Sequence, residues 1–231
     1  MIKYIKDSVQ NFNEARKEYD LHGIPFYILE PFNNRINTGT LLKQIEHLVP
    51  KHLLNNVEVF YVANIKDFKR KNRAFNAMYK DGAIYISPVQ DNEEDLLDDI
   101  IHEIAHSFEN EYQDYIFGDG LLEREFVGKR KRLYYLVDKP TANLLVYSNP
   151  DYDTKFDNHL YHDLDYDYLR TVSAELFYSP YAITSLREYW ANGFENYLLG
   201  DKYALKDLSP VLYNKLEGVL DTQNFEGNIQ K

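Results

Sequence analysis

His102, Glu103 and His106 form the pattern His-Glu-x-x-His, which has the clearest chemical meaning in this sequence. On a helix, two histidines four positions apart project from one face a single turn apart, so both imidazoles can bind one ion. In zinc hydrolases with this pattern, the glutamate beside the first histidine is the general base. A pattern of only five residues can also occur by chance, and two histidines on a helix are ordinarily part of the protein surface or its core. The pattern therefore predicts a metal site only if the surrounding sequence supplies its other parts.

The pattern must be carried by a helix, and the apolar residues around it recur at helical spacing. They form one stripe that a core would bury, namely Leu96, Leu97, Ile100, Ile101, Ile104, Ala105 and Phe108. An acidic run at residues 91–95 precedes the stripe, and negative charge is favourable at the positive end of a helix dipole. We therefore expect a helix that begins near this run and belongs to the core.

A catalytic zinc ion usually takes three protein ligands and one water, so a third ligand is needed. The sequence has no cysteine, which leaves His, Asp or Glu. Glu188 is the best candidate, because it lies near the start of an expected helix, with Ser185 as a possible N-cap. Asn192 follows one turn later, where it could hydrogen-bond a ligand histidine and fix its orientation. On composition alone, a solvent-facing carboxylate is the more ordinary interpretation of Glu188.

Two blocks of the sequence resemble one family of zinc peptidases. They are residues 102–106 (HEIAH), and residues 179–185 (SPYAITS) leading into residues 188–197 (EYWANGFENY). The chain is similar in these blocks to the anthrax lethal factor-like peptidases, a gluzincin group that includes the bacterial Pro-Pro endopeptidases. The resemblance covers roughly residues 76 to 220 and is weak before Val57. It implies a zincin-like catalytic domain with metalloendopeptidase activity.

The resemblance also implies a role for each matching residue. The implied ligands of one zinc ion per chain are His102, His106 and Glu188. Glu103 would be the general base, and the hydroxyl of Tyr181, seven residues before Glu188, would stabilise the oxyanion. Asn192 stands where relatives usually carry an acid. Its amide oxygen still accepts a hydrogen bond but brings no charge, so zinc affinity or the pKa of the bound water would be altered.

A hairpin is expected before the metal-binding pattern. Asp81-Gly82 is a turn dipeptide that supplies positive φ, and it separates residues 76–79 from the apolar residues 83–87. The first of these segments is similar to the Asn-Ala-aromatic edge strand of other gluzincins, which pairs with an extended peptide through main-chain hydrogen bonds. Its residues are Asn76, Ala77, Met78 and Tyr79. The alternative is a plain edge strand, since every open sheet has one.

The remaining segments predict an α+β architecture, with strands first and helices later. We expect strands at 24–29 and 57–62 with a helix at 41–54 between them, and later helices at 121–136, 166–177, 185–199 and 208–220. Residues 139–165 lack a clear period and predict an irregular excursion beside a binding site. We interpret residues 1–231 as a single zincin-like catalytic domain. Its strand-bearing upper lobe would cover about residues 1–110 and its helical lower lobe about 111–231.

Two polar clusters have a functional and an ordinary interpretation. His159, His162, Asp163 and Asp165 could hold a second metal, but a solvated acidic loop is the more ordinary interpretation. The basic run from Lys129 to Arg132 could contact a substrate or phosphate, but a solvated helix face is the more ordinary interpretation.

Composition narrows the class of protein. The chain has 26 basic and 37 acidic residues, a net charge of −11, which disfavours a nucleic-acid-binding surface. No window approaches eighteen uninterrupted apolar residues, so we expect no membrane span. The first twenty residues are charged throughout and lack the apolar stretch of a signal peptide, which leaves a cytoplasmic location and export without such a signal both open.

The expected partner is a protein or peptide substrate, and the sequence carries no signal for an oligomeric state. Two other functions fit the same residues. One is a catalytically inactive zincin-like binding or structural module, such as a toxin or particle component, and the other is a hydrolase for esters or small amides. The intact ligand set with Glu103 and Tyr181 argues against the inactive module, because a decayed enzyme usually loses one of these groups.

Overall fold

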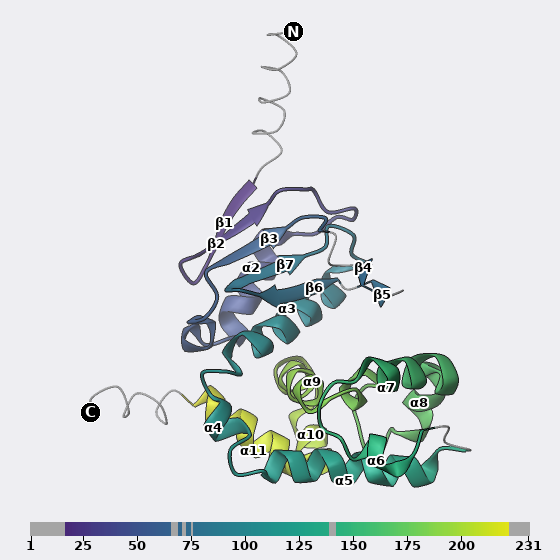
Figure 1. Cartoon of the computed structure of the whole chain (residues 1–231). Coiled ribbons are helices and arrows are strands. Elements are labelled where there is room, and N and C mark those ends of the chain that lie inside the picture. Colours follow the sequence, from purple (N-terminus) through teal and green to yellow (C-terminus); the bar gives the residue numbers. More distant parts are fainter. Residues whose placement is uncertain (1–16, 66–68, 71–72, 75, 139–141, 222–231) are drawn as a thin grey trace, which may run out of the picture. The chain divides into compact units, whose positions relative to one another are not determined.

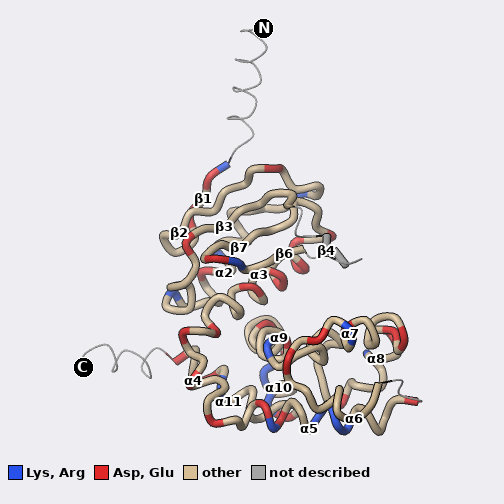
Figure 2. The backbone as a smooth tube through the Cα atoms, in the orientation of Figure 1, with Lys and Arg blue, Asp and Glu red and all other residues tan. Residues whose placement is uncertain are grey.

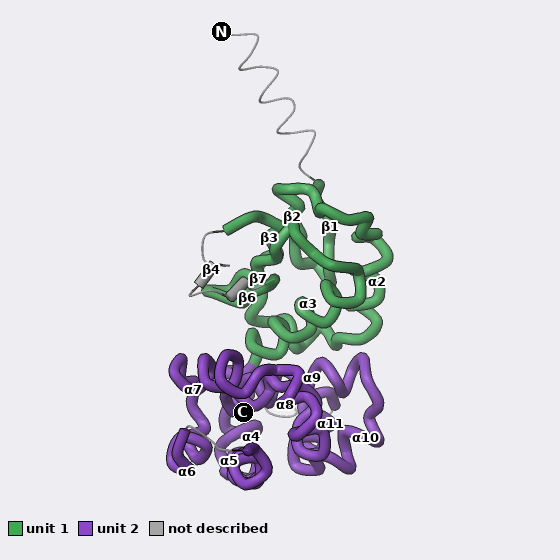
Figure 3. The backbone as a smooth tube through the Cα atoms, turned by 90° about the vertical axis from the view of Figure 1, so that its right-hand side faces the viewer, with its two compact units in different colours: residues 1–108 green, residues 109–231 purple. Residues whose placement is uncertain are grey.

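The computed structural model describes residues 17–65, 69–70, 73–74, 76–138 and 142–221. The chain divides into two compact units, residues 1–108 and 109–231 (Figure 3). The first unit contains a five-stranded mixed sheet, and the described part of the second unit is helical, which confirms the α+β class. No helix within the described ranges is both long enough and apolar enough to cross a membrane.

The sheet of the first unit has the strand order β1-β2-β3-β7-β6. Its strands are β1 (Lys17–Leu21), β2 (Ile24–Ile28), β3 (Val59–Val62), β6 (Ala77–Lys80) and β7 (Ala83–Ile86). The two outer pairs are antiparallel, whereas β2, β3 and β7 run parallel. A separate pair is formed by β4 (Lys69–Arg70) and β5 (Arg73–Ala74). The topology places β6 at one edge of the sheet.

The expected hairpin is β6–β7, and its turn is Asp81-Gly82. Both residues have positive φ, 50° and 80° respectively, as a two-residue type I′ turn requires. Strand pairing begins directly beside the turn, with Lys80 opposite Ala83. The turn residues therefore set the register of the edge strand.

Side chains of the sheet alternate between a buried and a half-exposed face. The buried face is covered by α2 (Thr38–Leu48) and α3 (Glu93–Phe108), which lie on the same side of the sheet (Figures 1 and 3). Its side chains include Phe26, Phe60 and Ile84, all fully buried. The opposite face carries a ladder of stacked rings 5.8 Å apart, formed by Tyr27, Tyr61 and Tyr85.

The helix expected at 41–54 is interrupted. Helix α2 ends at Leu48, and residues Lys51–Leu54 form the separate 3-10 helix η1. Pro50 lies between them and explains the break, because proline has no N–H to donate and disfavours helical backbone in the residue before it. Val49 is accordingly extended, with φ −105° and ψ 115°.

The second unit consists of short and long helices around one apolar core. They are α4 (Gln113–Ile116), α5 (Leu121–Leu136), α6 (Leu144–Tyr147), α7 (Thr154–Asn158), the π-helix η3 (His159–Leu164), α8 (Tyr166–Val172), the 3-10 helix η4 (Tyr181–Ile183), α9 (Leu186–Leu199), α10 (Lys202–Leu208) and α11 (Pro210–Leu220). Trp190 and Phe194 of α9 are fully buried in this core.

Two expectations for this unit were wrong. The expected irregular excursion contains α6, α7 and η3, while its residues 139–141 lie outside the described ranges. The helix expected at 166–177 ends at Val172 as α8. Local side-chain caps explain the additional helices: Asn143 begins α6 and Asp153 begins α7 by accepting hydrogen bonds from backbone N–H groups.

Helix α5 carries a run of four Lys and Arg residues, Lys129 to Arg132, and basic positions are marked along it in Figure 2. The expected solvated face was wrong for two of them, because Lys129 is 8% and Arg130 1% exposed. The Arg130 guanidinium donates to the carbonyl oxygens of Val146 and Asn149 and lies 4.1 Å from the ring centre of Phe156. Burial lowers the pKa of Arg130 to about 10. Arg130 therefore joins α5 to the segment around α6.

Candidate metal centre

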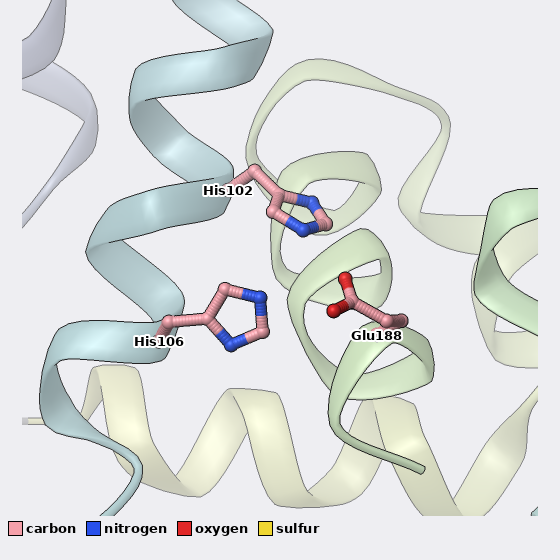
Figure 4. A group of neighbouring side chains, drawn as sticks. All are labelled: His102, His106 and Glu188. Atoms are coloured by element: carbon pink, nitrogen blue, oxygen red, sulfur yellow. The ribbon is translucent and has the colours of Figure 1, made fainter. Parts of the chain in front are cut away.

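Helix α3 presents His102 and His106 one turn apart. Its start matches the acidic run, and the side chain of Asn92 accepts a hydrogen bond from the backbone N–H of Asp95 at 2.8 Å. The apolar stripe of α3 is buried as expected except at Leu97, which is half-exposed, and Ile100, Ile101 and Ile104 are fully inaccessible. The centres of the two imidazole rings are 5.0 Å apart, and both rings leave the same side of α3 (Figure 4).

Glu103 is held by the edge strand. Its carboxylate Oε2 accepts a hydrogen bond from the backbone N–H of Tyr79 in β6, at 2.6 Å. The hydroxyl of Tyr79 in turn donates to the carbonyl of Asn56 at 3.2 Å. A hydrogen bond to a carboxylate is shorter and stronger than one between neutral groups, so it fixes the orientation of Glu103. The expected base and the expected substrate strand are thus in direct contact within the first unit.

Helix α9 places Glu188 in its first turn. Ser185 is the N-cap, as expected, and its hydroxyl accepts a hydrogen bond from the backbone N–H of Glu188 at 3.2 Å. The N–H of Leu186 donates to the carbonyl of Pro150 at 2.8 Å. Tyr181 begins the 3-10 turn η4 just before this helix, and its carbonyl accepts a hydrogen bond from the Thr184 hydroxyl. Two hydrogen bonds therefore satisfy N–H groups at the start of α9 that lack helical partners.

The two neighbours of Glu188 each bind a carboxylate. Arg187 donates from Nε to Oε2 of Glu109, and the hydroxyl of Tyr189 donates to Oε1 of Glu125 at 2.9 Å. Burial, and then the Glu125 charge, raise the pKa of Tyr189 well above its usual value. These contacts restrain the rotation of α9 about its own axis and thereby the direction in which Glu188 points.

His102, His106 and Glu188 form a group that could hold a metal ion. Each offers one ligand atom, these atoms lie within 4.8 Å of one another, and all three residues are partly exposed (Figure 4). Two imidazole nitrogens and one carboxylate oxygen are a donor set that suits zinc, and three protein ligands leave a position for water. The chemistry of the donors thus fits a catalytic zinc ion.

Asn192 has partners on its own helix. Its side-chain amide donates to Oε2 of Glu195 at 3.4 Å, and its backbone carbonyl accepts a hydrogen bond from the side-chain amide of Asn196 at 2.8 Å. Asn192 is 6% exposed, so its amide is largely removed from solvent. Its expected hydrogen bond to a ligand histidine stays a prediction.

The residues considered for a second metal do not form a three-ligand group within the described part of the chain. His159 is 6% exposed, its Nδ1 lies 2.9 Å from Oδ2 of Asp163, and its Nε2 lies 3.4 Å from the Tyr147 hydroxyl. Asp165 instead caps α8 by accepting a hydrogen bond from the N–H of Asp167. The pair of His159 and Asp163 is thus part of the packing of the π-helix.

Sequence reasoning missed Glu109, Glu125 and Arg187. Each contacts a residue at a separation of 64 or more along the chain, so no local pattern predicts the pairs. The one available signal was position, since Arg187 directly precedes Glu188 and Glu109 comes three residues after His106.

Comparison of the chain with protein-family models, with curated proteins and with solved structures found no match. The resemblance to lethal factor-like peptidases therefore depends on the motif residues themselves.

Proposed function

We propose that the protein is a zinc-dependent metalloendopeptidase with a zincin-like catalytic domain. The observation that carries the proposal is the grouping of His102, His106 and Glu188, whose donors match those of catalytic zinc sites. Glu103 directly follows His102, and its carboxylate is held by the edge strand, so it would supply a base next to the first ligand. The inactive binding module, by contrast, would require neither the base nor the edge strand.

His102, His106 and Glu188 would hold the ion. When bound, zinc lowers the pKa of its water and polarises the scissile carbonyl. Glu103 takes one proton from the attacking water and later delivers it to the nitrogen of the leaving amine. Because Oε2 of Glu103 is engaged by the N–H of Tyr79, we assign the proton to Oε1.

Tyr181 supplies the donor for the oxyanion in this proposal. Its hydroxyl would donate a hydrogen bond to the carbonyl oxygen of the substrate as negative charge develops there. One such donor typically contributes about 3 kcal/mol to the stability of the transition state. Tyr181 is half-buried, and its backbone is fixed by the two bonds that its carbonyl accepts from Thr184.

Strand β6 offers its outer edge to an extended peptide. In an antiparallel pair, the residues beside a two-residue turn bond to each other, so Lys80 and Met78 point their backbone groups toward β7. Ala77 and Tyr79 then point theirs outward, and the Tyr79 N–H is the donor that reaches Glu103. The groups left for the substrate are both backbone groups of Ala77 and the carbonyl of Tyr79. A bound peptide would thus lie next to the base.

The experiment combines metal analysis with digestion of a peptide library. We expect one zinc ion per chain, cleavage of peptides, and loss of cleavage with retention of zinc in Glu103→Gln. His102→Ala and Glu188→Ala should each lose zinc. Glu94→Gln is the matched control, because Glu94 is an exposed acid on the same helix and should change neither property.

Four outcomes would overturn the proposal. A wild-type protein that binds no zinc has no such site, and cleavage that survives Glu103→Gln has another origin. One zinc ion per chain without cleavage would support the inactive module. Product from an ester or small amide alone would support a non-peptide hydrolase.

A further inference from the structure

The ion pair between Glu109 and Arg187 connects two places in the chain that adjoin the proposed zinc ligands. Glu109 directly follows the last residue of α3 and comes three residues after His106. Arg187 directly precedes Glu188. The two residues are 78 positions apart, and Nε of Arg187 donates to Oε2 of Glu109. Both belong to the second unit.

The pair is asymmetric in its burial. The side chain of Glu109 is 2% exposed, whereas that of Arg187 is 61% exposed. A buried carboxylate is costly without a partner, so Glu109 favours a conformation in which a cation reaches it. The N–H groups of the planar guanidinium point in fixed directions, so the guanidinium can donate to a carboxylate only from a narrow range of orientations. The buried Glu109 is therefore held in place by the surrounding protein, and it orients the more exposed Arg187.

The backbone carries this restraint to Glu188. Arg187 and Glu188 are consecutive in the first turn of α9, where Ser185 caps the N–H of Glu188. A rotation or slide of this turn would move both side chains together. Tyr189, on the other side of Glu188, is tied to Glu125 within the same unit. The ligand thus lies between two residues that each have an ionic or charged partner.

We propose that the Glu109–Arg187 ion pair is a positioning pair for the zinc ligand Glu188. The inference rests on the proposed zinc site and adds residues that touch neither the ion nor the substrate. Metal sites tolerate ligand displacements of only about 0.5 Å before function is lost. Loss of the ion pair would loosen the first turn of α9 and weaken zinc binding while the unit remains folded.

The test measures zinc affinity by chelator competition and the visible absorption spectrum of the cobalt-substituted protein. We expect Arg187→Gln to weaken zinc binding by roughly 10- to 100-fold, the usual cost of losing a group that orients a metal ligand. Its cobalt spectrum should shift, because the carboxylate ligand is displaced. Arg187→Lys, which keeps the charge, should recover part of the affinity. Glu109→Gln should act like Arg187→Gln, and the double variant should be no worse than either single variant.

Two controls separate positioning from general stability. Arg170→Gln breaks the ion pair between Arg170 and Asp167, whose side chains are 71% and 86% exposed respectively. This variant should leave the zinc affinity and the cobalt spectrum unchanged. The unfolding midpoint of each variant is followed by the fluorescence of the buried Trp190. Arg187→Gln should lower it, because the buried Glu109 loses its cation, whereas Glu109→Gln removes the buried charge itself and should keep a midpoint close to that of the wild type while its zinc affinity still falls.

An unchanged zinc affinity and cobalt spectrum in Arg187→Gln would overturn the inference, as would an equal loss in Arg170→Gln. A wild-type protein that binds no zinc would overturn the proposed function as well. A wild type that binds zinc but cleaves nothing would overturn the peptidase alone, and the affinity series would still support the positioning pair.

Discussion

Replacement of Glu125 by glutamine should destabilise the second unit strongly. Glu125 projects from α5 and accepts three hydrogen bonds: from the Tyr189 hydroxyl at 2.9 Å, the N–H of Val211 at 2.8 Å and the N–H of Leu212 at 3.1 Å. The two N–H groups belong to the first turn of α11, where they lack helical acceptors. One carboxylate thus caps α11 and anchors α9.

The magnitude follows from the loss of one charged acceptor oxygen. Glutamine keeps one acceptor oxygen but replaces the other with an NH₂ group. All three partners of Glu125 are donors, so this NH₂ group would face a donor and could not bond with it. A hydrogen bond to a charged group contributes about 1.5–3 kcal/mol, and a charge at a helix start about 0.3–1 kcal/mol more. We expect Glu125→Gln to lower the free energy of unfolding by about 2–4 kcal/mol, which lowers Tm by roughly 4–16 °C in a protein of this size.

The assay is thermal unfolding followed by tryptophan fluorescence. Trp190 is the single tryptophan of the chain and is fully buried in α9, so its emission reports the packing of this helix. Tyr189→Phe removes one of the three bonds to this charged group and should cost about 1.5–3 kcal/mol. Glu123→Gln is the matched control, because Glu123 is an exposed acid on the same helix. If the Tm of Glu125→Gln equals that of Glu123→Gln, Glu125 is not the residue that caps α11 and anchors α9.

Two further predictions concern the second unit. Burial lowers the pKa of Lys129 from 10.5 to about 8, so between these pH values the unfolded chain binds a proton that the folded chain does not. The free energy of unfolding should therefore rise with pH across this window by up to about 3 kcal/mol, and urea titrations at pH 7 and 10 should show that Lys129→Met lacks this rise. Equal changes in both proteins would contradict the prediction. A methyl group at Gly193 would lie 2.8 Å from Cγ of Leu212, whereas Gly128 has no atom within 4 Å of such a group. In the same titration we expect Gly193→Ala to lower the free energy of unfolding by about 1–2 kcal/mol and Gly128→Ala to raise it by about 0.5–1 kcal/mol. If both variants change it in the same direction, the packing argument is wrong.

The elements that sequence predicted correctly share a strong local signal. Helix α3 has an acidic start and a complete apolar stripe, α9 has its N-cap at Ser185, and the β6–β7 hairpin has Asp81-Gly82. In each case the residues that determine the structure are neighbours in the chain. Local propensity and tertiary packing therefore favour the same conformation.

The elements that sequence missed depend on distant partners or weak patterns. Strand β1 has the sequence KEYDL, which is mostly exposed and gains its structure by pairing with β2. Lys129 and Arg130 look like solvated charges, but aromatic rings and backbone carbonyls elsewhere in the unit accept them. Burial of a cation on such partners is a property of the fold, which no short window of sequence contains.

The candidate site shows the same division. The types and spacing of His102, Glu103 and His106 predicted a helix with two candidate ligands, and the place of Glu188 at an expected helix start, together with the family resemblance, supplied a third candidate. These three candidates form a group that could hold a metal ion. The restraints on these residues were not predicted, because the partner of Glu103 is a backbone N–H and the partner of Arg187 lies 78 residues away. The residue types of the candidate site could thus be predicted from sequence, whereas the contacts that hold those residues could not.

The contact between Glu103 and Tyr79 has a consequence for the order of folding. The two residues are only 24 positions apart, and hairpin, base and both histidines lie within residues 77–108. Contacts of short sequence separation form early, because little chain entropy is lost when they close. During synthesis this segment leaves the ribosome long before Glu188 is added. A nascent chain could therefore carry the Glu103–Tyr79 contact and both imidazoles before Glu188 is translated, and the proposed three-ligand site would be completed only afterwards.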